Sequence, residues 1–178
     1  MKSLVVYSSR TGNTEKVARA IHEILPAPCD IHSVETAPDP GDYGFVAIGF
    51  WVDKGEPDTK AKDYMKRVQG RKVGLFGTLG AWPDSDHARE CLDKARELMA
   101  GNEVLGTFIC QGRIDPAVLE MMRKMASAAH PMTPERQARI REAEKHPDEA
   151  DLLAAQAAFR DMAARLGAGG TGDAPCVP

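Results

Sequence analysis

The sequence predicts an α/β protein built on a doubly wound parallel sheet, and two observations support this. Strand-like and helix-like segments alternate from the N-terminus to about residue 110. The first apolar strand also runs into a hydroxyl-rich loop and then directly into a helix. Parallel strands need helical crossovers, which cover both faces of the sheet, and right-handed crossovers make it doubly wound.

The first half of the chain supplies three strands and two helices. Residues 2–8 form an apolar strand, and residues 14–25 form a helix because their apolar side chains recur at helical spacing. Pro26 and Pro28 end this helix. The next elements are expected to be a short polar strand at 30–34, a buried strand at 43–50 and a helix at 58–68.

The second half supplies two strands and more helices than a minimal fold of this kind needs. We expect a strand at 72–76, a helix at 84–99 and a strand at 104–110. Residues 115–148 are polar and helical and are interpreted as an addition, with helices at about 116–129 and from Pro134 onward, the latter capped by Thr133. The final helix, 151–166, is assigned to cover the sheet. The prediction is one domain, 1–166, followed by a flexible tail, 167–178.

Composition narrows the functional classes. The 178 residues include 23 basic and 26 acidic side chains, and this net charge of −3 argues against nucleic-acid binding. No apolar run approaches the roughly 20 residues of a membrane span, and the N-terminus enters a strand at once, so a cytoplasmic protein is expected. The four cysteines are expected to be free thiols in a reducing compartment. Neither they nor the five histidines have metal-type spacing, so no metal site is expected.

The loop after the first strand is the strongest candidate site. Its backbone amides and the positive end of the following helix converge where a phosphate can bind. It has no Walker lysine, and no GxGxxG occurs in the chain, so a lone phosphate monoester such as that of FMN fits best. The alternative is a turn that caps the helix and binds nothing. The candidate residues are Ser9, Arg10, Thr11, Gly12, Asn13 and Thr14.

This loop resembles a known family fingerprint. Residues 9–14, Ser-Arg-Thr-Gly-Asn-Thr, after an N-terminal strand are similar to the [ST]-x-T-G-N-T motif with which flavodoxins wrap the FMN phosphate. The resemblance implies FMN as the cofactor and a flavodoxin-like, five-stranded sheet in the order 2-1-3-4-5. It also places the ligand at the carboxyl ends of the strands, beside the first strand. Arg10 either pairs with the phosphate or points to solvent.

Two further loops are expected to hold the flavin ring, and each carries one of the two tryptophans of the chain. The resemblance implies ring stacking, main-chain contacts to the pyrimidine edge and a peptide near Gly55 that faces flavin N5. Lys54 either lies near the ring or is an ordinary surface lysine. The candidates after the third strand are Phe50, Trp51, Val52, Asp53, Lys54 and Gly55, and those after the fourth are Thr78, Leu79, Gly80, Ala81 and Trp82.

The function expected from this resemblance is electron transfer by bound FMN between transient redox partners, with a monomer favoured over a dimer. No catalytic residue is assigned, because an electron carrier needs no general base or nucleophile. One alternative is an FMN-dependent reductase of NAD(P)H, a quinone or another small molecule. Another is an interaction module that has lost FMN. The added helices are interpreted either as a docking surface or lid, or as cover for an edge strand.

Overall fold

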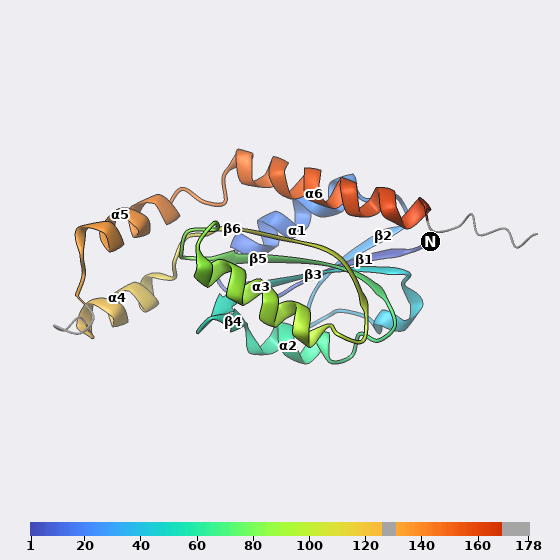
Figure 1. Cartoon of the computed structure of the whole chain (residues 1–178), viewed down its shortest axis with the longest axis horizontal. Coiled ribbons are helices and arrows are strands. Elements are labelled where there is room, and N and C mark those ends of the chain that lie inside the picture. The colour runs from blue at the N-terminus through green and yellow to red at the C-terminus, as the bar shows by residue number, and fades with distance from the viewer. Residues whose placement is uncertain (126–130, 169–178) are drawn as a thin grey trace, which may run out of the picture.

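The computed structural model describes residues 1–125 and 131–168. Strands and helices alternate along the body of the protein, and three helices follow the last strand (Figure 1). The elements are β1 (Ser3–Tyr7), α1 (Asn13–Ile24), β2 (Cys29–Ser33), a 3₁₀ turn (Pro40–Asp42), β3 (Phe45–Asp53), β4 (Glu56–Pro57), α2 (Thr59–Met65), β5 (Lys72–Leu79), α3 (Asp86–Leu98), β6 (Glu103–Gln111), α4 (Pro116–Lys124), α5 (Pro134–Ala143) and α6 (Glu149–Ala168).

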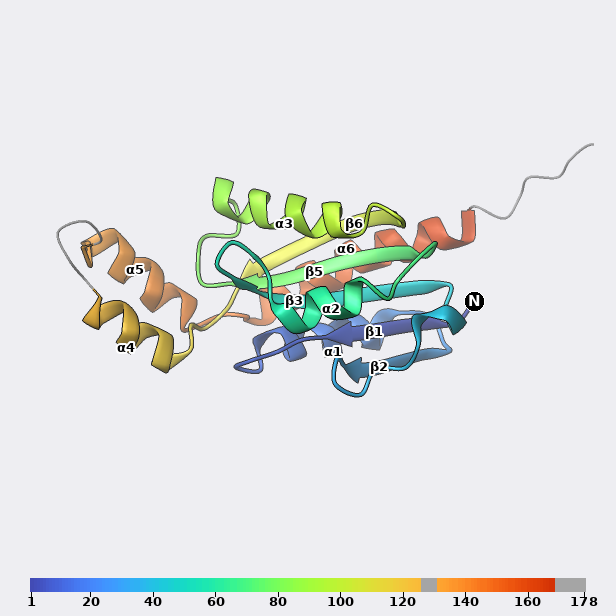
Figure 2. The same ribbon diagram turned by 90° about the horizontal axis from the view of Figure 1, so that it is seen from below.

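The sheet confirms the predicted order. Its five parallel strands lie in the order β2-β1-β3-β5-β6, which is 2-1-3-4-5 when only the parallel strands are counted. The sequence did not indicate the two-residue strand β4, which pairs antiparallel with the end of β3. Because the strands are parallel, their carboxyl ends meet at one edge, the edge from which β6 leads to α4 (Figure 2).

Helices cover both faces of the sheet. On one face, α1 and α6 pack through a cluster that includes Ile21, Phe159 and Phe76. On the other face, α2 and α3 pack through a second cluster that includes Met65 and Met99 (Figure 1). The choice of the last helix as the cover after the final strand is therefore confirmed. Phe159 contacts the rings of Phe45 and Phe76 edge-on, with centroids 6.5 and 5.8 Å away.

Two strands extend beyond their predicted ends. β3 continues through Phe50, Trp51 and Val52 to Asp53, and β5 continues to Leu79, so the first parts of both expected flavin loops are strand. Aromatic and β-branched side chains favour this extended conformation. β3 then turns back into β4 through Lys54 and Gly55, whose φ values of 51° and 83° are those of a two-residue hairpin turn.

The added helices α4 and α5 lie side by side beyond the carboxyl-end edge of the sheet (Figures 1 and 2). The prediction of a first helix reaching about residue 129 and a break at His130 extends into 126–130, outside the described residues. α6 ends two residues later than predicted, and 169–178 of the expected tail also lie outside the described part. Within the described residues, no helix is long and apolar enough to cross a membrane.

Candidate functional site

The loop between β1 and α1 has the backbone geometry of an anion-binding turn. Gly12 has a φ of 86°, a left-handed conformation that glycine adopts without steric cost. Its amide donates to Ser9 Oγ at 3.1 Å. The structure records no side-chain cap on α1, which begins at Asn13. The first amides of this helix therefore point out of the turn toward the space where an anion would be bound.

Side chains tie this loop to other strands. Asn13 Nδ2 donates to Thr11 Oγ1 at 2.9 Å and to the carbonyl oxygen of Arg113 at 2.8 Å. The hydroxyls of Thr14 and Thr78, both buried, lie 2.9 Å apart and share a hydrogen bond. These contacts connect the β1–α1 loop to the carboxyl ends of β5 and β6, so the loop is held against the strand edge where the ligand is expected.

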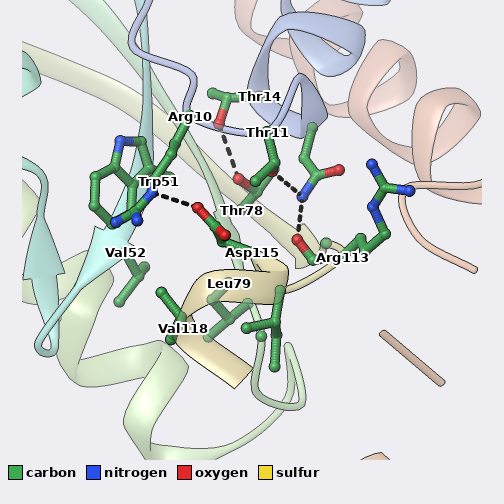
Figure 3. A pocket seen from close by; sticks show the side chains of 14 residues that line it. Arg10, Thr11, Thr14, Trp51, Val52, Thr78, Leu79, Arg113, Asp115 and Val118 are labelled. Atoms are coloured by element: carbon green, nitrogen blue, oxygen red, sulfur yellow. Dashed lines mark hydrogen bonds and ion pairs between the residues drawn. The ribbon is translucent and has the colours of Figure 1, made fainter. Parts of the chain in front are cut away.

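A cavity opens beside this loop (Figure 3). Four segments converge on the cavity: the β1–α1 loop, the end of β3, the end of β5, and the connection from β6 into α4. The lining residues are Arg10, Thr11, Asn13, Thr14, Trp51, Val52, Thr78, Leu79, Gly80, Gly112, Arg113, Ile114, Asp115 and Val118.

Arg10 links three sides of this cavity (Figure 3). Its Nε donates to Asp115 Oδ2 at 2.7 Å, and its guanidinium carbon lies 5.6 Å from the centre of a Trp51 ring. The Ala117 amide and then Arg10 hold the pKa of Asp115 below its ordinary range. Both partners are partly exposed, so this ion pair positions the arginine more than it stabilises the fold.

Asp58 organises the site from beneath, and the sequence analysis did not assign it this role. Its carboxylate is 2% exposed and accepts from Ser8 Oγ at 2.7 Å and from the amides of Lys60 and Ala61. It also lies 3.4 Å from the Trp51 amide. Asp58 thus caps α2 while holding the ends of β1 and β3 together. An aspartate at the start of a predicted helix is an N-cap signal, but the contact with Ser8 spans 50 residues and leaves no local trace.

The residues predicted to contact the flavin ring lie in different parts of the structure. Trp51 and Val52 line the cavity, as do Thr78, Leu79 and Gly80. Phe50 is fully buried in the core and does not line it. Lys54 and Gly55 form the hairpin turn, where Lys94 Nζ donates to the Gly55 carbonyl at 3.0 Å. Asp53 lines a neighbouring hollow with Arg10 and Trp51.

Trp82, the second tryptophan, does not share the cavity with Trp51. Its side chain is 43% exposed and lines a separate hollow against α5. Ala81 precedes it in the same loop and is also absent from the lining of the main cavity. The two tryptophans therefore line different hollows, and only Trp51 lines the cavity expected to hold the ring.

The sequence did not indicate that residues 112–118 form one wall of the cavity. Ile114 packs so closely on Gly80 that a Cβ at that glycine would lie 2.5 Å from Ile114 Cγ1. Val118, in the first turns of α4, completes the apolar side. The available signal was topological: the loop after the last parallel strand ends at the same edge as the other loops.

A doubly wound sheet with an uncapped helix N-terminus and an aromatic-lined cavity at its carboxyl ends defines a nucleotide- or flavin-binding α/β protein. The flavodoxin domain model matches residues 4–160. The chain therefore belongs to the flavodoxin family, a family of FMN-binding redox proteins.

Individual relatives agree with this assignment. The flavodoxin-like domain-containing protein BilS of Clostridioides difficile (strain CD3) is 34% identical over 169 residues, covering 91% of this chain and 96% of the relative. The two-electron reduced flavodoxin of Megasphaera elsdenii is 25% identical, with a TM-score of 0.51 over 60% of this chain and 84% of that one. Flavodoxin 2 of Bacillus cereus shares the fold, with a TM-score of 0.59 at 19% identity over 93% and 99% of the two chains.

Proposed function

We propose that this protein binds FMN in the cavity beside the β1–α1 loop and carries electrons between redox partners. One observation carries the proposal: the uncapped N-terminus of α1 and the hydroxyls of its loop open into a cavity with an aromatic wall. Anions are stabilised at helix N-termini, and aromatic side chains stack on planar rings. FMN combines both chemical features in one ligand.

Each group of lining residues has a defined part in this proposal. The first amides of α1 and the hydroxyls of Thr11 and Thr14 hold the phosphate, with Arg10 near enough to add a positive charge. The main chain at Leu79 and Gly80 faces the ring edge, and Trp51 and Val52 face the ring. Bound FMN supplies the electron-transfer chemistry, while the protein binds, orients and shields it.

The carrier works, in this proposal, as a cytoplasmic monomer that meets its partners briefly at the carboxyl-end face. Trp51 and Val52 are only partly buried, so a partner can approach the ring there. Contacts of this kind are small and transient in redox pairs. The proposal also keeps the predicted contact between the hairpin and flavin N5, which requires the Lys94 bond to the Gly55 carbonyl to rearrange.

FMN titration of the flavin-free protein tests the binding site. Replacing both Thr11 and Thr14 by alanine is expected to weaken FMN binding by roughly tenfold or more, because hydrogen bonds to a charged group are worth about 1.5–3 kcal/mol each. Thr36→Ala, at an exposed threonine outside the cavity, is the matched control and should bind as the parent protein does. Equal affinity in all three proteins would remove the phosphate-loop assignment.

A second candidate function is an FMN-dependent reductase of NAD(P)H, a quinone or another small molecule. The observation in its favour is the additional wall from Gly112 to Val118, since a covered cavity shelters a second substrate better than an open one. Stepwise anaerobic photoreduction of the FMN-loaded protein separates the candidates. Two resolved one-electron stages support the carrier, whereas a single two-electron stage together with NAD(P)H turnover by the isolated protein supports the reductase.

A further inference from the structure

A second, open hollow is lined by the β5–α3 loop and the start of α5. It is lined by Trp82 from that loop and by Thr133, Glu135, Arg136 and Arg139 from the start of α5. None of these residues lines the FMN cavity, although Gly80, only two positions before Trp82, does. The two hollows are thus neighbours with separate linings.

Two arginines line this second hollow. Arg136 and Arg139 lie one helical turn apart, so their side chains share a face of α5. The Nε atom of each is buried and has no hydrogen-bond partner within the described part of the chain. Among residues 1–125 and 131–168, neither guanidinium takes part in an ion pair, whereas Arg10, Arg19 and Arg89 each pair with a carboxylate. Buried donors without an acceptor are costly and rare in folded proteins.

The electrostatics of the hollow favour a bound anion. Burial, and then the charge of Arg136, lowers the pKa of Arg139. Glu135 also lines the hollow, but in the described structure it makes no ion pair with either arginine. Its own amide and then the Thr133 hydroxyl lower its pKa. An oxyanion bound beside the two guanidiniums would offset their mutual repulsion.

The arginines project from a helix that is held in place. Thr133 Oγ1 accepts from the Arg136 amide at 3.2 Å and caps α5. Gln111, at the buried end of β6, donates to the carbonyl oxygen of Arg139 at 3.4 Å. Opposite them, Trp82 exposes an aromatic surface, since 43% of the residue is accessible. A positively charged pair and an aromatic wall thus share one hollow.

We propose that this hollow binds a small planar organic acid, with Arg136 and Arg139 holding its carboxylate or phosphate and Trp82 stacking on its ring. Planar guanidinium groups are suited to donate to the two oxygens of such a group. This site is independent of FMN binding.

Calorimetric titration of the full chain tests the site at constant ionic strength. The probes are isophthalate, phenyl phosphate, inorganic phosphate and the neutral isophthalamide. We expect saturable 1:1 binding of isophthalate or phenyl phosphate and none of isophthalamide. The tighter of the two anions identifies the acid as a carboxylate or a phosphate ester. Equal binding of isophthalamide, or binding of inorganic phosphate alone, would overturn the proposal.

Variants locate the binding. Arg136→Gln and Arg139→Gln are each expected to weaken the binding of the organic anion by about tenfold or more, because each removes a charge-assisted hydrogen bond. Arg141→Gln, at an exposed arginine on the same helix, is the matched control and should bind as the parent does. Trp82→Ala should weaken both aromatic anions. If the Arg136 and Arg139 variants bind as tightly as the parent, the site is not here.

The same proteins keep this inference apart from the FMN proposal. Circular dichroism checks that each variant is folded, and FMN titration of the Arg136 and Arg139 variants is expected to match the parent, because neither residue lines the FMN cavity. A parent protein that binds the organic acid but not FMN would refute the proposed function alone. A parent that binds FMN but no organic acid would refute this inference alone.

Discussion

The α/β body and the α4–α5 pair are stabilised in different ways. In the body, α1 buries six of its twelve residues, and two continuous apolar clusters fill both faces of the sheet. In contrast, α4 buries none of its residues and α5 buries only Ile140 and Ala143. Met121 and Met125, which are 54% and 69% exposed, belong to the α4 segment.

This difference separates stability from recognition. The core of the body gains its free energy from buried apolar area. The helical pair buries little, yet it supplies Asp115 and Val118 to one hollow and Arg136 and Arg139 to the other. We therefore expect substitutions at fully buried core positions of the body to change unfolding, and substitutions of these lining residues of the pair to change binding.

The largest contrast is expected between two methionines. Met99→Ala removes a fully buried side chain from the core and should lower the free energy of unfolding by about 2–5 kcal/mol. Met121→Ala, at a half-exposed position on α4, should change it by less than about 0.5 kcal/mol. Urea denaturation measures both. Similar losses in the two variants would show that α4 is part of the cooperative core.

A smaller loss is expected at Asp58, beneath the candidate FMN cavity. Asp58→Ala removes the α2 cap and leaves the buried Ser8 hydroxyl without its acceptor, which should cost about 2–3 kcal/mol of unfolding free energy. Asp63→Ala, at an exposed carboxylate paired with Lys66, is the matched control, with an expected cost under about 0.5 kcal/mol. Denaturation curves that coincide for the two variants would contradict the organising role of Asp58.

The ion pair between Arg10 and Asp115 connects the α/β body to the start of α4. Its loss should affect the α4–α5 pair alone. Asp115→Asn is expected to speed hydrogen exchange of the α4 amides and leave the β-sheet amides unchanged. Because the folded pKa of Asp115 is lowered, its contribution is present above the unfolded pKa of about 3.9 and is lost as pH falls through the folded pKa. Asp86→Asn, which breaks a pair within α3, is the control.

The smallest effect on stability is expected at His146, which lies in the connection between α5 and α6. Its pH dependence is opposite to that of Asp115. The hydrogen bond that His146 Nδ1 donates to the Asp151 carboxylate raises the pKa of His146. Its contribution to stability is therefore complete below the unfolded pKa of about 6.5 and is lost as pH rises through the folded value. The free energy of unfolding of the parent protein, measured across the pH range between these two pKa values, should fall as pH rises. This fall should be absent in His146→Gln, and the same pH profile in both proteins would refute the role given to His146.

Local sequence patterns were sufficient for much of the body. The alternation of strand and helix patterns predicted the parallel sheet, and the family resemblance implied its order. The last helix was assigned as a cover of the sheet, and residues 9–14 were predicted to form a loop followed by a helix. The strand and helix patterns depend on residues a few positions apart, so they are readable without the fold.

The residues that line each hollow could not be predicted from local sequence patterns. The pairing of Ser8 with Asp58, the approach of Ile114 to Gly80 and the separation of Trp51 from Trp82 all involve residues far apart in the chain or on different strands. The similar position of the two tryptophans after neighbouring strands suggested one shared site. Only the path of each loop beyond the sheet edge decided which side chain faced which hollow.

The sequence by itself thus determined the layers of this protein and its phosphate-type loop, because hydrophobic periodicity and backbone preference act locally. The tertiary structure alone decided that α4 and α5 lie beyond the carboxyl-end edge (Figure 1) and that two arginines of α5 line one hollow with Trp82. α5 is polar and carries no strong apolar pattern, and α4 buries none of its residues, so neither helix indicated its own position. Their placement follows from the strands, caps and long-range hydrogen bonds that hold their ends.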